Sequence, residues 1–183
     1  MRRIGLAVIA LAAVGIAGCA HKRPQSITLS ATVPALTPQS CHSENGLPDS
    51  ACTPGEVRTT DANNICHGGS TKQYRPPSSF TNALKRKQLI AYRYADTNPG
   101  DYEEDHLISL EIGGAGADPK NLWPEPHDGK DNSFDKDRVE NWLHRQICSG
   151  AMTPDEAQKG IRRDWRQYLP QVNGVATKGK EIQ

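Results

Sequence analysis

This sequence lacks a large net charge, a closely spaced pair of cysteines and any internal repeat. Its 22 basic and 21 acidic residues leave a formal net charge of +1. The overall charge therefore gives no reason to expect a polyanionic partner, and any basic surface must be local. Without a Cys-x-x-Cys spacing, the usual structural zinc sites are disfavoured. Without repeats, a repeat architecture is excluded.

The first residues, MRRIGLAVIALAAVGIAGC, have the three parts of an export signal: a basic start, an apolar stretch from Ile4 and small residues before Cys19. The alternative is an uncleaved membrane helix, because the apolar stretch is only a little shorter than the ~20 residues that span a bilayer. The ending IAGC resembles the lipobox of bacterial lipoproteins. This resemblance implies that residues 1–18 are a signal peptide and that Cys19 carries a diacylglyceryl group.

A lipidated chain of this kind is expected in the bacterial cell envelope, on its periplasmic or cell-surface side. Several acyl chains, at ~0.8 kcal/mol per buried methylene, would anchor it to the membrane. Ala20 after the lipidated cysteine resembles outer-membrane lipoproteins, so that membrane is favoured if the host has two. Removal of 18 of the 183 residues leaves 165, enough for one compact domain with an extended N-terminal lead.

The cysteines after Cys19 are even in number, and in an exported chain this predicts two disulfides. They are Cys41, Cys52, Cys66 and Cys148. Of the three possible pairings we favour Cys41 with Cys52, which closes a short loop, and Cys66 with Cys148, which joins the two halves of the chain. The alternative is a zinc site that adds the neighbouring His42 and His67.

The composition divides the rest of the chain into three parts. Residues 19–54 are rich in Pro, Ser and Thr without a helical or strand period, so we expect a tether and a stapled loop. Residues 55–170 should form the folded domain. Residues 171–183 follow Pro170 and are expected to be a flexible tail.

Helical periodicity predicts a helix in SSFTNALKRKQLIAYRYA, residues 78–95. Leu84, Gln88 and Tyr92 recur every four residues, and Ser79 or Thr81 could cap the helix.

Two more helices are expected near the end of the chain. In FDKDRVENWLHRQICSG, Val139, Leu143 and Ile147 share one face, and Gly150 ends the helix. In TPDEAQKGIRRDWRQYLP, Thr153, Pro154 and Glu156 form a capping box with proline at the first helical position. This helix should bury Ala157, Ile161 and Trp165 and stop at Pro170.

The segment YEEDHLISLEIGG, residues 102–114, places Asp105 and His106 on an expected strand before the pair Gly113 and Gly114. Adjacent strand residues point to opposite faces, so Asp105 could face a metal while His106 faces a substrate phosphate. A second short strand, NLWPEP, begins at Asn121 and precedes the first of the two later helices.

The segments DHLISLEIGG, NLWPEP and KDRVENWLHRQICSG together resemble the HNH endonuclease family and its ββα-metal finger, over roughly residues 102–150. The resemblance implies an α+β fold. A small ββα-metal finger would carry additional helices and a disulfide-stapled N-terminal extension.

The resemblance also assigns roles to residues. It makes Asp105 a metal ligand, His106 the general base that activates water, and Asn121 the brace of the loop between the strands. Asn132 closes the metal site if the PEPHDGKD connection is two residues longer than the commonest form, and His127 is its competitor. Magnesium is the expected metal, with manganese and zinc as alternatives, since Mg²⁺ needs few protein oxygens and keeps several waters.

These roles predict a metal-dependent endonuclease that hydrolyses phosphodiester bonds in DNA or RNA with little sequence specificity. Its partners would be nucleic acid and, through the lipid anchor, a membrane; no protein partner is evident. The alternative is a non-catalytic envelope lipoprotein whose degenerate finger binds nucleic acid or an envelope component. The basic residues expected to contact phosphates are Lys120, Lys130, Lys136, Arg138, Arg162, Arg163 and Arg166.

Overall fold

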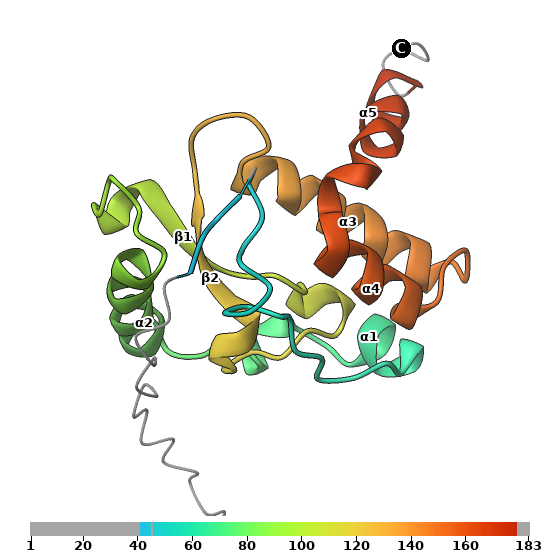
Figure 1. Cartoon of the computed structure of the whole chain (residues 1–183). Helices are drawn as coiled ribbons and strands as arrows, with labels where there is room; N and C mark the ends of the chain where they lie inside the picture. Colours follow the sequence, from blue (N-terminus) through green and yellow to red (C-terminus); the bar gives the residue numbers. More distant parts are fainter. Residues whose placement is uncertain (1–40, 45, 179–183) are drawn as a thin grey trace, which may run out of the picture. The chain divides into compact units, whose positions relative to one another are not determined.

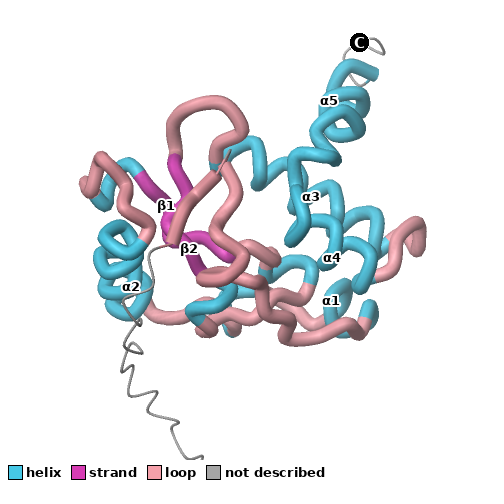
Figure 2. The backbone as a smooth tube through the Cα atoms, in the orientation of Figure 1, coloured by secondary structure: helices cyan, strands magenta, loops and turns pink. Residues whose placement is uncertain are grey.

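The computed structural model describes residues 41–44 and 46–178. The expected signal peptide, the lipidation site Cys19 and the first part of the tether lie outside these residues, as do the last five. No helix within the described residues is long and apolar enough to cross a membrane. The fold is α+β, with helices arranged around one small sheet (Figures 1 and 2).

The sheet consists of β1 (Tyr102–His106) and β2 (Leu122–Pro126), paired antiparallel with His106 opposite Leu122. The chain turns back between the strands through a glycine pair. Gly113 has a φ of 95°, in the left-handed region that favours glycine. A Cβ on Gly114 would lie 1.8 Å from the carbonyl oxygen of Ile108. Both positions therefore require glycine.

Helix α3 (Ser133–Cys148) follows β2, so the order strand, strand, helix is the one expected for this part of the chain. Its expected apolar face is buried, with Val139, Leu143 and Ile147 at most 4% exposed. Gly150 follows the helix with a φ of 75°, as expected for a residue that ends a helix.

Helix α4 (Pro154–Asp164) packs against α3 and has the expected capping box of Thr153 and Glu156. Its expected buried residues, Ala157 and Ile161, are 0% exposed. The same hydrophobic core extends to other elements. Its remaining buried members are Ile65, Ile108, Ile112, Val139, Leu143, Ile147, Trp165 and Val172.

The expected stop at Pro170 is wrong. A short 3-10 helix (Trp165–Tyr168) leads directly into α5 (Leu169–Lys178). Pro170 is the second residue of α5. The N–H groups of the first turn of a helix have no acceptor within the helix, so proline removes no helical hydrogen bond there. The segment after Gln171, expected to be a flexible tail, is therefore helical as far as Lys178, and Val172 is buried in the core.

Helix α2 (Ser78–Ala91) covers the sheet by placing Phe80 and Leu84 against Leu122 of β2. It has neither of the expected side-chain caps. Pro77 occupies the capping position and forms no side-chain hydrogen bond there. An additional helix, α1 (Ala62–His67), was not expected from the sequence because its six residues show little periodicity.

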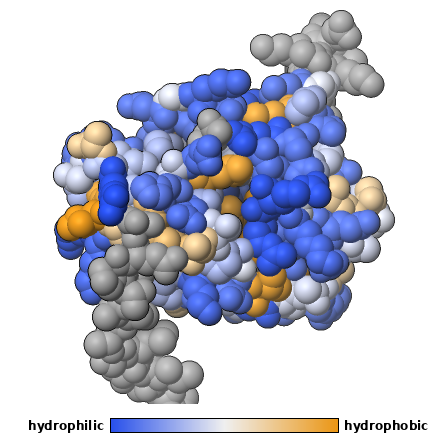
Figure 3. Space-filling view, in the orientation of Figure 1, coloured by the Kyte–Doolittle hydropathy of each residue, from blue (hydrophilic) through white to orange (hydrophobic). Residues whose placement is uncertain are grey.

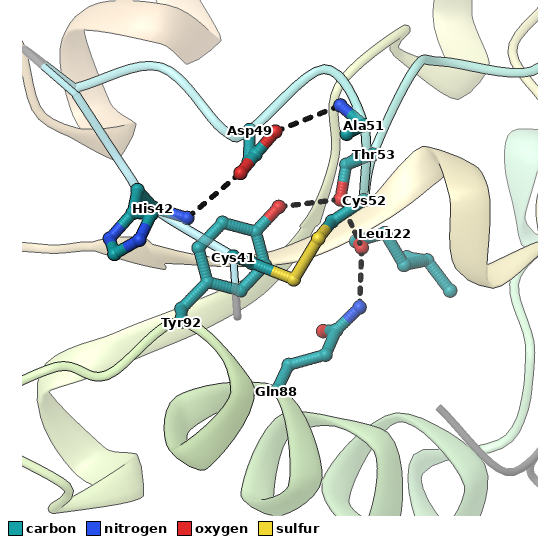
Figure 4. Close-up of a disulfide and its surroundings, with 9 residues drawn as sticks. All are labelled: Cys41, His42, Asp49, Ala51, Cys52, Thr53, Gln88, Tyr92 and Leu122. Carbon is teal, nitrogen blue, oxygen red and sulfur yellow. Dashed lines mark hydrogen bonds between the residues drawn. A yellow bond between two sulfur atoms is a disulfide. The ribbon is translucent and has the colours of Figure 1, made fainter. Parts of the chain in front are cut away.

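The two disulfides join Cys41 to Cys52 and Cys66 to Cys148, which confirms the favoured pairing. The first closes a loop of residues 41–52, which we call the stapled loop. The loop is held next to α2 and β2. The Cys41 N–H donates to the Ala91 carbonyl at 2.9 Å. Thr53, which follows the loop, lies 2.7 Å from the Tyr92 hydroxyl and donates to the Leu122 carbonyl at 3.4 Å (Figure 4). The second disulfide joins α1 to the end of α3.

Candidate active site

Asp105 and His106 are the last two residues of β1, and their side chains have different surroundings. Asp105 contacts Lys136 of α3, whereas the His106 ring contacts the backbone of the loop at Gly116. This separation agrees with the alternation of side chains along a strand. The end of β1 therefore places the Asp105 carboxylate against α3 and the His106 ring against the loop between the strands.

Among the described residues, the His106 ring has one hydrogen-bond contact. Its Nε2 lies 2.8 Å from the Gly116 carbonyl oxygen, which can only accept a hydrogen bond, so Nε2 carries the proton. This leaves Nδ1 as the nitrogen that can take a proton from water. Burial lowers the pKa of His106, although Asp105 opposes the shift, so the ring is neutral near pH 7. The residue is 4% exposed.

Asn121 fastens both ends of the loop between the strands. Its Oδ1 accepts from the Ile108 N–H at 2.9 Å, and its Nδ2 donates to the carbonyl oxygens of Ile108 at 2.9 Å and Ala115 at 2.8 Å. The side chain is fully buried. These contacts tie Asn121 to Ile108 and to Ala115, which precedes Gly116, the partner of His106.

Lys136 has a different place from the one expected. The sequence suggested a cation that contacts a phosphate, but Lys136 is 1% exposed and cannot reach a substrate. Its ammonium contacts one carboxylate oxygen each of Asp105 and Glu140 and donates to the His106 carbonyl at 2.9 Å. Glu125 of β2 lies 3.8 Å away. A buried lysine is therefore surrounded by three carboxyl groups.

One ammonium cannot neutralise three buried carboxylates, and the pKa values diverge accordingly. Burial would raise the pKa of Asp105, but Lys136 and His106 lower it to about 2. Burial raises the pKa of Glu140 to about 8, and that of Glu125 well above its usual range. Burial would lower the pKa of Lys136, but the carboxylates raise it. The ionised pair is thus Lys136 and Asp105, and burial favours the protonated form of Glu125 and Glu140.

Asn132 and His127, the two candidates for the last metal ligand, each make contacts elsewhere, although His127 Nε2 has no hydrogen bond among the described residues. Asn132 caps α3: its Oδ1 accepts from the Asp135 N–H at 3.2 Å and its Nδ2 donates to the Gly129 carbonyl at 3.0 Å. His127 Nδ1 lies 3.0 Å from the Ser133 hydroxyl, and its ring stacks on Phe134. Neither side chain contacts Asp105 within the described part of the chain.

Three charged residues near the pair were not assigned from the sequence. Arg75 is close enough to His106 to lower its pKa and also influences Asp137. Burial, followed by the charge of Asp105, raises the pKa of both Glu103 and Asp137. Arg75 lies in the turn before α2, far from β1 in sequence, so only the fold brings it close to His106.

Of the residues expected to hold a divalent cation, Asp105 has one carboxylate oxygen, Oδ1, that Lys136 does not contact. Lys136 contacts only Oδ2 of that carboxylate, and the side chain keeps 14% exposure. Magnesium needs few protein oxygens, so one carboxylate with water and phosphate oxygens can hold it. Asn132 would have to give up its cap contacts to become the second ligand.

One group of three potential metal ligands lies within the described residues, away from Asp105. Cys66, His144 and Cys148 have ligand atoms within 4.8 Å of one another. Both cysteines are disulfide-bonded, and a thiolate is the form that binds metals. The group could therefore bind a metal through its cysteines only after reduction.

Comparisons of the chain with family models, with curated proteins and with solved structures found no match.

Proposed function

We propose that this protein is a metal-dependent endonuclease that hydrolyses phosphodiester bonds in DNA or RNA with little sequence specificity. The observation that carries the proposal is the orientation of His106: a neutral imidazole with Nε2 fixed on a backbone carbonyl and Nδ1 left to accept a proton. A strand, strand, helix unit frames this histidine, and Asn121 braces its loop. These features agree with the resemblance of residues 102–150 to the HNH family.

In this mechanism His106 removes a proton from the water that attacks phosphorus. The Gly116 carbonyl keeps the ring in the required tautomer, and Asn121 keeps that part of the loop in place. Asp105 would hold the divalent cation, which supplies positive charge for the phosphate and the leaving oxygen. We propose Mg²⁺, with Mn²⁺ and Zn²⁺ as alternatives.

Arg75 is the best candidate for contacting the scissile phosphate. Its charge acts on both His106 and Asp137, so it lies near the base and near α3. Arginine suits this role because its planar group can bind two phosphate oxygens at once. The carboxyl group of Asp137 would oppose a phosphate, and the charge of Arg75, which acts on Asp137, offsets that repulsion.

The test is nicking of supercoiled plasmid by the purified protein with and without added divalent metal. The proposal requires nicking that stops with a chelator and returns with Mg²⁺ or Mn²⁺. Cleavage of unrelated plasmids at similar rates would support low sequence specificity. Absence of nicking with Mg²⁺, Mn²⁺ and Zn²⁺ would contradict the proposal.

A second candidate, a non-catalytic envelope lipoprotein that binds nucleic acid or an envelope component, is favoured by a different observation. Lys136 already supplies a cation to Asp105, and His106 is nearly covered. Binding of nucleic acid that persists with a chelator, without cleavage by any of the three metals, would favour this function. For either function we propose an envelope location with a lipid anchor at Cys19.

A further inference from the structure

A pocket of about 420 Å³ lies between the stapled loop and the end of α4. One wall consists of side chains between His42 and Ser50, and the other consists of Arg162, Arg163 and Arg166. No residue of β1 or β2 lines it, so it is separate from His106 and Asp105. Its volume is within the range of small-ligand pockets. The side of the molecule drawn in Figure 3 is largely hydrophilic.

Two of the three arginines have no acidic partner within the described residues. Arg166 is paired with Asp164 through Nε at 2.8 Å and Nη2 at 3.0 Å, so its charge is compensated. Arg163 donates to the neutral Gln167 side chain at 2.7 Å. The stem of Arg162 packs at Gly55, and its guanidinium has no hydrogen bond or ion pair among the described residues. The wall formed by α4 is therefore positively charged.

The opposite wall carries two acidic residues, Glu44 and Asp49, and neither forms an ion pair with an arginine among the described residues. The carboxylate of Asp49 accepts from the backbone N–H groups of His42 at 3.0 Å and Ala51 at 2.8 Å, so it is used within its own turn (Figure 4). Glu44 is exposed and can point into solvent. An anion on the arginine side can therefore contact two guanidinium groups.

We propose that this pocket binds a backbone phosphate of the nucleic acid, at a distance from the reacting bond. The inference rests on the proposed function and adds a second anchoring point for the same substrate. A guanidinium group can bind two phosphate oxygens at once, and contacts to phosphate carry no sequence information, which matches an enzyme with little sequence preference. The Cys41–Cys52 disulfide fixes the facing wall, so the pocket is formed before the substrate arrives.

The experiment measures binding of a mixed-sequence duplex oligonucleotide to the full-length chain by fluorescence anisotropy. The His106→Ala background slows cleavage during the measurement. Arg162→Ala with Arg163→Ala is compared with Arg86→Ala with Lys87→Ala, a matched loss of two exposed cations from α2. A third variant, Arg162→Lys with Arg163→Lys, keeps the charge.

The pocket variant should bind at least about tenfold more weakly, and the slope of log affinity against log salt should fall by about one to two. The α2 variant should stay within about twofold of the parent, and the lysine variant should recover most of the loss. Equal losses in the pocket and α2 variants, or no loss in either, would overturn the inference.

Two further comparisons identify the ligand and the source of any failure. Glycerol phosphate, a soluble mimic of a lipid headgroup, should displace the oligonucleotide no better than inorganic phosphate does. Selective displacement by it would reassign the pocket to a membrane lipid. If the parent chain nicks plasmid and the pocket variant binds the oligonucleotide as the parent does, the phosphate site in the pocket is wrong but the nuclease function stands. If the parent neither binds nor nicks, both the phosphate site and the nuclease function are wrong.

Discussion

At the scale of single residues, the burial of Lys136 differs most from what the sequence predicted. A lysine in a helix with several cations nearby is usually solvent-exposed, and the periodicity of the helix could not identify its acidic partners. Those partners come from β1, β2 and the next turn of α3. Burial of one ammonium with Asp105, Glu125 and Glu140 links the helix to both strands next to His106.

Replacement of Lys136 by methionine should lower the free energy of unfolding by about 3–5 kcal/mol, because it leaves a buried carboxylate without its counter-charge. The folded-state pKa of Asp105 is lowered to about 2, so the ion pair stabilises the fold above the unfolded pKa near 4. Its contribution disappears as the pH falls through about 2. Urea unfolding at several pH values measures this effect.

The exposed Arg138→Ala variant on the same helix is the control and should change stability by less than about 0.5 kcal/mol. Equal stability of Lys136→Met and the parent at pH 7 would show that the lysine does not compensate Asp105.

Glu104 provides a separate prediction about pH. Neither of its buried carboxylate oxygens has a hydrogen-bond partner among the described residues, and burial raises its pKa to about 9. The folded state therefore keeps the proton, and its stability is full below the unfolded pKa of about 4.5 and falls as the pH rises toward 9.

Between pH 5 and pH 8 the parent should lose on the order of 4 kcal/mol more stability than Glu104→Gln. Denaturant titrations of both proteins at these pH values give the comparison. The exposed Glu44→Gln variant should follow the parent. Parallel pH dependence in Glu104→Gln and the parent would argue against a buried neutral carboxyl group.

At the scale of elements, Asn132 shows how one residue type serves two roles. An asparagine before a helix can cap the helix or bind a metal, and both roles use the same side-chain oxygen. In α3 that oxygen accepts from Asp135. Asn132→Ala should cost about 1 kcal/mol of stability, whereas Asn132→Ser, which keeps a capping oxygen, should cost little.

Metal titration of the two variants decides between the roles. If both bind Mg²⁺ as the parent does, Asn132 is only a cap. Equal weakening of Mg²⁺ binding in both, with Asn132→Ser fully stable, would instead support the role of metal ligand.

The elements that could be predicted from the sequence have strong local signals. The strand with Asp105, the glycine pair, the second strand and the helices with apolar faces each follow from short-range patterns. Helix α1 was not predicted because it is too short to show a periodic pattern. Helix α5 was not predicted because Pro170 was interpreted as the end of a helix, although it lies in the first turn of α5. Arg75 could not be placed at the candidate site because its proximity to His106 depends on the whole fold.

At the scale of the whole molecule, the two disulfides should contribute unequally. They close loops with sequence separations of 11 and 82 residues. The chain-entropy account assigns about 3 kcal/mol to a loop of the first size and about 4.5 kcal/mol to the second. Cys66→Ser with Cys148→Ser should therefore lower the thermal midpoint more than Cys41→Ser with Cys52→Ser. The reverse order would mean that strain or residual unfolded structure outweighs loop closure.

We propose that His106 is the base of a metal-dependent nuclease. The most direct measurement is the plasmid-nicking rate of His106→Ala beside the parent and a His144→Ala control, with Mg²⁺ affinity and oligonucleotide affinity measured on the same preparations. The account predicts a rate lower by about 10²–10⁴ for His106→Ala, with both affinities unchanged and with His144→Ala near the parent. Nicking by His106→Ala at the parent rate would contradict it.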